Sequence, residues 1–284
     1  MSRGRWSAGS LVASLLAALG GCAEVEGDLV DEEPQALAET VEIAGSQAAL
    51  VASGTHVLDA DHSVHGDIGS AAGRVCFLTG VKGSLTPSTT PSAGRAVGVR
   101  VKGDRYEMFV DVDVANGKKL GLETRCVTGA SRRTEERQWN AGEPPKVLAD
   151  VTFGRKCFLT GVRSRTVPGF GAGFKQSADK VQVYNDGKSW YLTGSQSGFA
   201  SATAQCVDTG LSAGFWVWQA GDPGARKDFL TTNPGDVDCF LTAVGGRFDG
   251  GDLSDGVHIG YETDTKNFFL HTKNGKSGYV LCTK

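Results

Sequence analysis

The hexapeptide CFLTGV occurs twice in the chain, and a third copy differs from it in one residue. It stands at Cys76–Val81, recurs at Cys157–Val162, and returns as CFLTAV at Cys239–Val244, at intervals of 81 and 82 residues. Each copy also has a second cysteine near its end, and these are Cys126, Cys206 and Cys282. The body of the chain is therefore one unit that is repeated three times.

Each copy continues with the same succession of short apolar segments. An alternating segment comes first, at Val97–Val99, Val181–Val183 and Val257–Ile259. An aromatic segment follows, at Tyr106–Phe109, Trp190–Leu192 and Phe268–Leu270. Alternating β-branched and aromatic residues between clusters of Gly, Asn and Asp are typical of short strands. The 40 glycines and the lack of a helical period also indicate strands and turns in place of helices. We expect an all-β fold of three tandem, small antiparallel sandwich or barrel modules, at residues 51–129, 130–210 and 211–284, with packing around a pseudo-threefold axis as one arrangement.

The cysteines predict one disulfide in each module. The chain has seven cysteines, of which six belong to the repeats. Six cysteines allow fifteen pairings, and the repeat favours the pairing within copies: Cys76 with Cys126, Cys157 with Cys206, and Cys239 with Cys282. The alternative is a zinc site, but no CxxC spacing is present.

The N-terminus has the pattern of an export signal. Arg3 and Arg5 precede the apolar run Leu11–Leu19, which is too short to span a bilayer. The next residues, Leu19-Gly20-Gly21-Cys22, resemble the lipobox of bacterial lipoproteins. The resemblance implies that residues 1–21 are removed and that the Cys22 sulfur carries a diacylglycerol anchor. It also implies the cell envelope as location, with the outer membrane favoured by the alanine after Cys22. The alternative is an ordinary signal peptide with an unmodified cysteine.

Residues 22–50 form an acidic segment with a composition of their own. This segment has eight Asp or Glu residues and neither Lys nor Arg nor an aromatic residue. Such a segment cannot bury enough apolar surface to offset its ordering entropy. We expect a disordered, flexible tether that holds the body clear of the lipid surface. A weak helix over Gln35–Gln47 is the alternative.

The charge of the chain and the motifs that it lacks disfavour several classes of function. The chain has 29 Lys+Arg against 32 Asp+Glu, a formal net charge of −3, which disfavours a nucleic-acid binder. No nucleophile elbow, zinc-protease motif or phosphate-binding glycine pattern occurs, so we predict that the protein is not an enzyme. A hydrolase with one active copy stays open, because acids lie on or beside predicted strands, namely Glu107, Asp111, Asp113 and Glu262.

Aromatic side chains are the candidate ligand contacts. Flat rings suit pyranose sugars, and neighbouring aromatic residues on a strand put one ring on each side of it. The candidates are Trp190, Tyr191, Phe268, Phe269, Trp139 and Trp218. For Trp139 and Trp218, core packing is the preferred interpretation.

Two polar runs are candidate metal sites. Oxygen ligands separated by glycine suit Ca²⁺, which makes Asp249, Asp252 and Asp255 a possible calcium site, although the spacing differs from an EF-hand. An Asp/Gly turn explains the same residues. The run His56–Asp67 has imidazoles and carboxylates that suit zinc or copper, and a solvated turn is the preferred interpretation there. We expect no cofactor beyond this possible Ca²⁺.

We therefore expect a lipid-anchored binding or adhesion protein of the cell envelope. Its partners would be the membrane, through the anchor, and a polysaccharide or an envelope protein. Repetition on a tether would give multivalency. A structural lipoprotein of an envelope assembly is the main alternative, and a hydrolase with one specialised repeat is a weaker one.

Overall fold

The computed structural model shows an all-β chain. It describes residues 51–52, 54–88, 94–112, 117–129, 132–167, 171–195, 199–209, 212–219, 222, 226–233 and 235–284. The predicted signal peptide, lipobox and tether lie outside the described residues, as does Asp113. Every regular element in the described part is a strand, which confirms the predicted fold class. This part has no helix of the length and hydrophobicity needed to cross a membrane.

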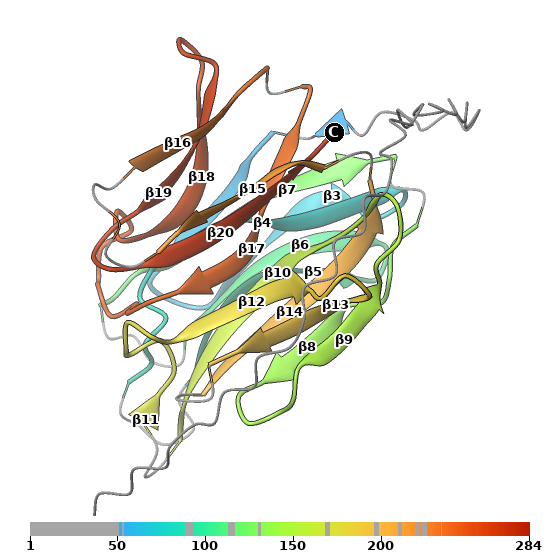
Figure 1. Ribbon diagram of the computed structural model, residues 1–284. Helices are drawn as coiled ribbons and strands as arrows, with labels where there is room; N and C mark the ends of the chain where they lie inside the picture. The colour runs from blue at the N-terminus through green and yellow to red at the C-terminus, as the bar shows by residue number, and fades with distance from the viewer. Residues whose placement is uncertain are drawn as a thin grey trace, which may run out of the picture. The chain divides into compact units, whose positions relative to one another are not determined.

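The strands form three antiparallel sheets within one compact unit (Figure 1). The first sheet has the order β1 (Val51–Ala52), β7 (Leu120–Thr128), β4 (Arg74–Gly83), β18 (Gly256–Glu262), β19 (Asn267–Thr272) and β16 (Arg226–Thr231), with β2 (His56–Ala60) also paired to β7. The second has the order β3 (Val64–Ser70), β6 (Arg105–Val112), β5 (Gly94–Lys102), β10 (Arg155–Val167), β14 (Ala200–Asp208) and β8 (Arg137–Asn140), with β11 (Gly171–Ala172) paired to β10. The third has the order β15 (Ser212–Trp218), β20 (Ser277–Thr283), β17 (Asp238–Gly245), β12 (Lys180–Asn185), β13 (Ser189–Gly194) and β9 (Lys146–Asp150).

Each sheet combines strands from two repeats. The β5–β6 hairpin of the first repeat pairs with β10 of the second, and the β12–β13 hairpin of the second pairs with β17 of the third. The β18–β19 hairpin of the third repeat pairs with β4 of the first, so the exchange is cyclic. The finer prediction of three tandem sandwich or barrel modules is therefore not confirmed, because the described sheets share repeats and none closes on itself.

Three phenylalanines, one from each repeat, meet at the centre of the unit. Phe77, Phe158 and Phe240 have ring centres 4.9, 5.2 and 5.0 Å apart, with interplanar angles between 57° and 63°. All three side chains are buried. Near-equal distances and angles of this kind describe a pseudo-threefold axis that passes between the three rings.

The recurrent threonine is a β-bulge residue in every copy. On β10, Leu159 pairs with Ala204 and Gly161 with Thr203, so Thr160 is the extra residue. The same register shift falls at Thr79 on β4 and at Thr242 on β17. A bulge of this kind reverses the alternation of side chains beyond it. For this reason the leucine before the bulge and the valine after it lie on the same face of the strand, where both are buried.

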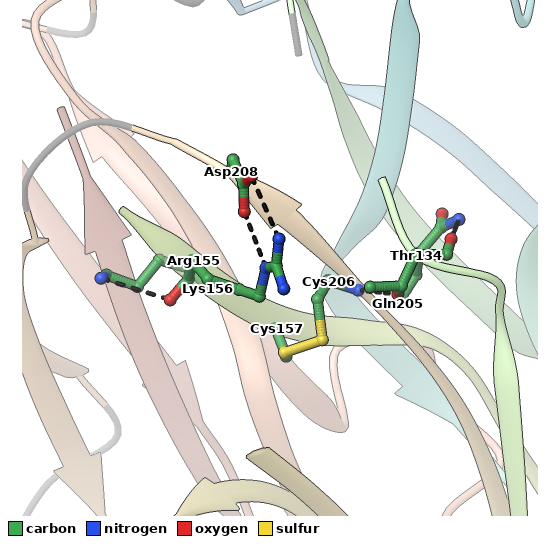
Figure 2. The surroundings of a disulfide bond; sticks show 7 residues. All are labelled: Thr134, Arg155, Lys156, Cys157, Gln205, Cys206 and Asp208. Atoms are coloured by element: carbon green, nitrogen blue, oxygen red, sulfur yellow. Dashed lines mark hydrogen bonds and ion pairs between the residues drawn. A yellow bond between two sulfur atoms is a disulfide. The ribbon is translucent and has the colours of Figure 1, made fainter. Parts of the chain in front are cut away.

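The disulfides have the predicted pairing within copies. Cys76–Cys126, Cys157–Cys206 and Cys239–Cys282 each join directly opposite residues of neighbouring strands, with Cα atoms 3.9, 3.9 and 4.0 Å apart. Figure 2 shows the second disulfide, with an ion pair between Arg155 and Asp208 at 2.7 Å beside it. Each bridge therefore joins two neighbouring strands of one sheet.

Candidate functional site

The outward face of the second sheet is hollowed along β5. Directly opposite residues of antiparallel strands share a face, and the register places Gly94, Ala96 and Gly98 on one face of β5, with Arg163 beside Ala96. The residues between them are buried on the other face. The small residues Gly94 and Ala96 leave a trough between β6 and β10. A pocket of about 520 Å³ lies there, and Arg165 and Arg163 line it from β10.

The guanidinium groups of the two arginines in the trough are available to a ligand. Arg163 is half-buried and Arg165 is exposed. Within the described part of the chain, neither guanidinium group forms an ion pair or a side-chain hydrogen bond. Guanidinium groups form paired, charge-assisted hydrogen bonds with carboxylate, phosphate and sulfate groups. The β10 side of the trough is therefore suited to an anionic group.

An aromatic ring lies beside the pocket on the same face of the sheet, two residues along β6 from the pocket residue Asp111. Phe109 of β6 pairs with Gly98 of β5. An ideal Cβ at Gly98 would lie 2.7 Å from Phe109 Cζ, so the ring occupies the space that a side chain at position 98 would need. Arg100 lies over the ring, with its guanidinium carbon 4.9 Å from the ring centre. The phenylalanine is half-buried, which leaves part of it open to a ligand.

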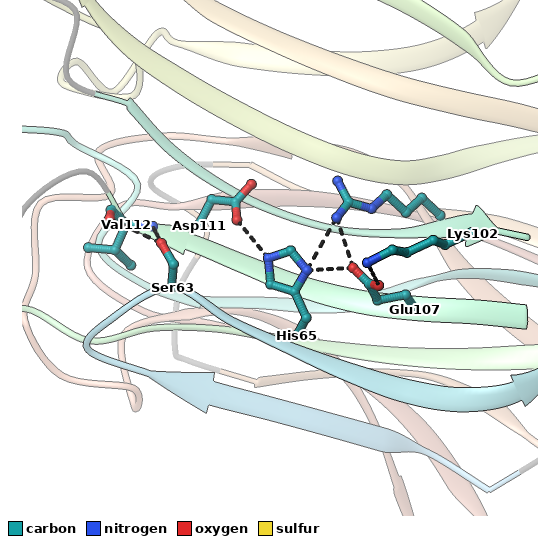
Figure 3. Close-up of polar contacts among 7 residues, drawn as sticks. Ser63, His65, Lys102, Glu107, Asp111 and Val112 are labelled. Carbon is teal, nitrogen blue, oxygen red and sulfur yellow. Dashed lines mark hydrogen bonds and ion pairs between the residues drawn. The ribbon is translucent and has the colours of Figure 1, made fainter.

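A network of charged side chains is centred on Glu107 of β6 (Figure 3). Glu107 contacts His65 Nδ1 at 2.5 Å, accepts a hydrogen bond from Arg100 at 2.8 Å and pairs with Lys102 at 3.1 Å. Asp111, which lines the pocket, lies 3.3 Å from His65 Nε2. The hydrogen bond from Arg100 is the main reason that the pKa of Glu107 falls to about 2. This carboxylate is therefore held ionised, and it serves to position the cations around it.

A second pocket, of about 380 Å³, adjoins Arg100 and the bulge residue Thr160. Glu136 lines it and accepts a hydrogen bond from the Thr160 hydroxyl, which also contacts Thr203 Oγ1 at 2.8 Å. Burial raises the pKa of Glu136. In the other two copies the bulge hydroxyls, of Thr79 and Thr242, are buried without a hydrogen-bond partner. The second repeat thus has a polar site that its two counterparts lack.

Most of the predicted aromatic contacts lie in the core. Trp139, Trp218, Trp190 and Phe268 are only 0%, 3%, 6% and 1% exposed, so their faces are covered by protein. The preference for core packing at Trp139 and Trp218 agrees with this placement.

The second ring of each predicted pair lies on an outward face. Tyr191 stacks on Tyr184, with ring centres 5.3 Å apart. Phe269 has the guanidinium carbon of Arg226 4.2 Å from its ring centre. Both rings are half-buried and remain candidate contacts, but neither lines the trough.

The predicted calcium residues point to three different partners. Asp249 pairs with Arg247, and Asp252 accepts a hydrogen bond from the Ser254 amide in a local turn. Asp255 is buried and pairs with Lys276. These contacts are those of an Asp/Gly turn and not of a converging ligand set.

The predicted histidine run is also dispersed. His62 pairs with its neighbour Asp61, His56 contacts Arg74, and His65 belongs to the network around Glu107. Across the described residues, no three His, Cys, Asp or Glu side chains are grouped so as to hold a metal ion.

Sequence reasoning missed the trough residues Arg163 and Arg165 and the adjacent Phe109. Phe109 and the arginines come from different repeats, and only the exchange of hairpins brings them to one face. The available signal was the small residue at every second position of Gly94–Gly98, which is unusual in a strand. Comparison of the chain with protein families and with curated proteins finds no match.

Proposed function

We propose that the protein is a lipid-anchored, carbohydrate-binding protein of the cell envelope, with the trough of the second sheet as its binding site. The observation that carries this proposal is a pocket with a floor of small residues and two arginines without an ion-pair partner in the described part of the chain, next to the ring of Phe109 on the same face of the sheet. Sugars are bound by flat rings that cover their apolar face and by planar polar side chains that bond their hydroxyl groups. The volume of about 520 Å³ lies in the range of small-molecule sites.

The arginines favour an acidic sugar. Arg163 and Arg165 can each offer two parallel donors to a uronic acid carboxylate or a sulfate group. Asp111, on the other side of the pocket, suits the hydroxyl groups of the same ring. The ligand class we propose is therefore a polysaccharide with acidic units.

Binding fits this site better than catalysis. Glycoside hydrolysis needs a carboxyl group that stays protonated beside one that is ionised. Two of the acids considered for this role, Glu107 and Glu262, have pKa values near 2, because Arg100 and Arg226 hold them ionised. Neither can act as the proton donor near neutral pH.

The location rests on the N-terminal sequence. The lipobox-like Leu19–Cys22 and the acidic segment up to residue 50 support an anchor and a spacer. The three disulfides support an oxidising compartment. Mass spectrometry of the membrane fraction would test this proposal. We expect a diacylglycerol-modified Cys22 at the N-terminus of the mature chain.

The carbohydrate proposal is tested by binding to immobilised acidic and neutral polysaccharides. Full-length protein should bind an acidic polysaccharide, and the double variant Arg163→Gln/Arg165→Gln should bind it at least tenfold more weakly. The control is Arg247→Gln/Lys188→Gln, which removes two exposed charges from elsewhere in the body. Phe109→Ala should weaken binding of acidic and neutral units alike. Equal binding by the arginine variant and the control would refute the proposed site.

An interaction with an envelope protein is the second candidate, and two exposed rings favour it. Phe153 is 75% exposed and Phe215 is 55% exposed, and side chains of this size are usually covered. A stable complex recovered from membranes that is lost on Phe153→Ser or Phe215→Ser would support this role. In that case the polysaccharide assay should show no binding.

A further inference from the structure

The outward face of the first sheet has two histidines side by side. His258 of β18 and His271 of β19 are directly opposite each other in the antiparallel pair. Their ring centres are 4.8 Å apart, and their planes are tilted by 34°. Metal–nitrogen bonds are about 2.0–2.1 Å long, so two imidazoles on one tetrahedral ion have ring centres about 5 Å apart. The observed separation thus matches that of a shared metal ion.

Neither ring has a hydrogen-bond partner among the described residues. Burial is the main cause that lowers the pKa of His258 to about 4, and burial also lowers the pKa of His271. His271 Nδ1 is buried without a hydrogen-bond partner. No hydrogen bond to the His258 ring occurs among the described residues. Ring nitrogen atoms without another partner are available as metal ligands.

The neighbouring strand approaches the pair closely through a glycine. Gly80 of β4 lies next to His258, and an ideal Cβ there would come within 2.9 Å of His258 Cβ and 3.1 Å of Glu123 Oε2. The glycine therefore lets an acid and an imidazole approach each other over the strand. Glu123 forms an ion pair with Lys82, so its charge is already balanced.

We propose that His258 and His271 form a two-imidazole site for a divalent transition-metal ion, with water in the remaining positions. Imidazole nitrogen suits copper and zinc, and a given nitrogen site binds Cu²⁺ more tightly than Zn²⁺. The site lies on a different sheet from the trough, and so it does not depend on the proposed carbohydrate binding.

The pseudo-threefold symmetry shows that the fold does not require this pair. Val257, Val97 and Val181 occupy equivalent positions, because they pair with Val81, Val162 and Val244 of the three cysteine strands. The positions of His258 and His271 then correspond to Gly98 and Phe109 in the second sheet, and to Gln182 and Thr193 in the third. Glutamine at position 258 is thus a residue that the equivalent strand already accepts.

The test uses full-length, tag-free protein and Cu²⁺ as the probe, followed by calorimetry and electron paramagnetic resonance. We expect one tight equivalent of Cu²⁺ with a spectrum of at least two nitrogen ligands, and weaker binding of Zn²⁺. His258→Gln and His271→Gln should each bind Cu²⁺ at least tenfold more weakly. Their thermal unfolding without metal should stay cooperative. His62→Gln/His65→Gln, which removes two of the three histidines of the predicted polar run, should bind like the wild type.

Three results would overturn the proposal. The first is wild-type protein without a tight equivalent of Cu²⁺, a result that needs no variant to fold. The second is a spectrum with fewer than two nitrogen ligands. The third is loss of binding in His62→Gln/His65→Gln while His258→Gln binds normally, since it would place the ion in the polar run.

Discussion

Phe158 offers the sharpest test of the intertwined fold. Its side chain is fully buried, and its ring centre lies 4.9 Å from that of Phe77 and 5.0 Å from that of Phe240. Truncation of a buried phenylalanine to alanine costs about 3–5 kcal/mol. The two ring pairs account for about 0.5–1.5 kcal/mol each within that loss. We expect Phe158→Ala to lower the free energy of unfolding by about 4 kcal/mol.

The form of the unfolding transition matters as much as its midpoint. Because the three rings join strands of all three sheets, the loss should destabilise the whole unit. Urea unfolding with the disulfides intact, followed by tryptophan fluorescence and by far-ultraviolet circular dichroism, should give one cooperative transition with both probes. Phe153→Ala is the matched control, because that ring is 75% exposed and its loss should change stability by less than about 0.5 kcal/mol.

Two outcomes would refute this reasoning. A loss below about 1 kcal/mol would mean that the rings do not carry the packing assigned to them. A separate transition with a third of the signal would mean that the second repeat unfolds alone. The latter is the behaviour of tandem modules and not of exchanged hairpins.

Three further predictions concern stability. Asp238→Asn should raise the free energy of unfolding by up to about 3 kcal/mol at pH 7.5 and leave it unchanged at pH 4, measured by urea unfolding at both pH values. Burial raises the pKa of Asp238 to about 6, although Arg125 lies 4.0 Å away. The wild type therefore loses stability as the pH rises through 6. Equal effects of the substitution at the two pH values would contradict this cause. Lys276→Met should cost about 3–5 kcal/mol in thermal or urea unfolding, because it leaves the buried Asp255 carboxylate without its cation, and a second change, Asp255→Asn, should recover most of the loss. Replacing both cysteines of the Cys157–Cys206 bridge by alanine should cost about 2–5 kcal/mol by the same measurement, and an unchanged midpoint would show that the bridge adds nothing to the paired strands.

The repeat made the strands and the disulfides predictable. Alternating residues and turn signals depend on local geometry, and a strand has the same pattern in whichever sheet it lies. The pairing of Cys157 with Cys206 followed from the equivalence of the copies. The exchange of hairpins could not be predicted in this way. A hairpin can pair with the cysteine strand of its own repeat or with that of a neighbouring repeat, and tertiary packing decides between the two.

The bulge explains why a simple alternation fails within CFLTGV. Strict alternation would place Leu159 and Val162 on opposite faces of β10. With Thr160 as an extra residue they share one face, whereas Phe158 and Gly161 lie on the opposite face. The recurrent threonine thus has a positional role, which the sequence alone does not distinguish from an ordinary strand residue.

Four of the six aromatic candidates are buried, and a related reason explains why the sequence did not distinguish them. Alternation shows that Trp190 and Tyr191 lie on opposite faces, but not which face is covered. The structure buries the larger ring and leaves the tyrosine on the outward face. Packing of the larger apolar surface inside is the energetically favoured choice, since burial is worth about 25 cal/mol per Å².

The three copies share their interior and differ on their outward faces. The positions equivalent by pseudo-symmetry are a phenylalanine, a leucine and a valine in every cysteine strand, and all nine side chains are buried. On the outward faces the equivalent positions have Gly98 and Phe109 in the second sheet, and His258 and His271 in the first. Three identical sites, as simple multivalency would require, are therefore not what this body offers. The common interior allows each face to have its own chemistry, so changes to the trough should leave the histidine pair unaffected, and the reverse.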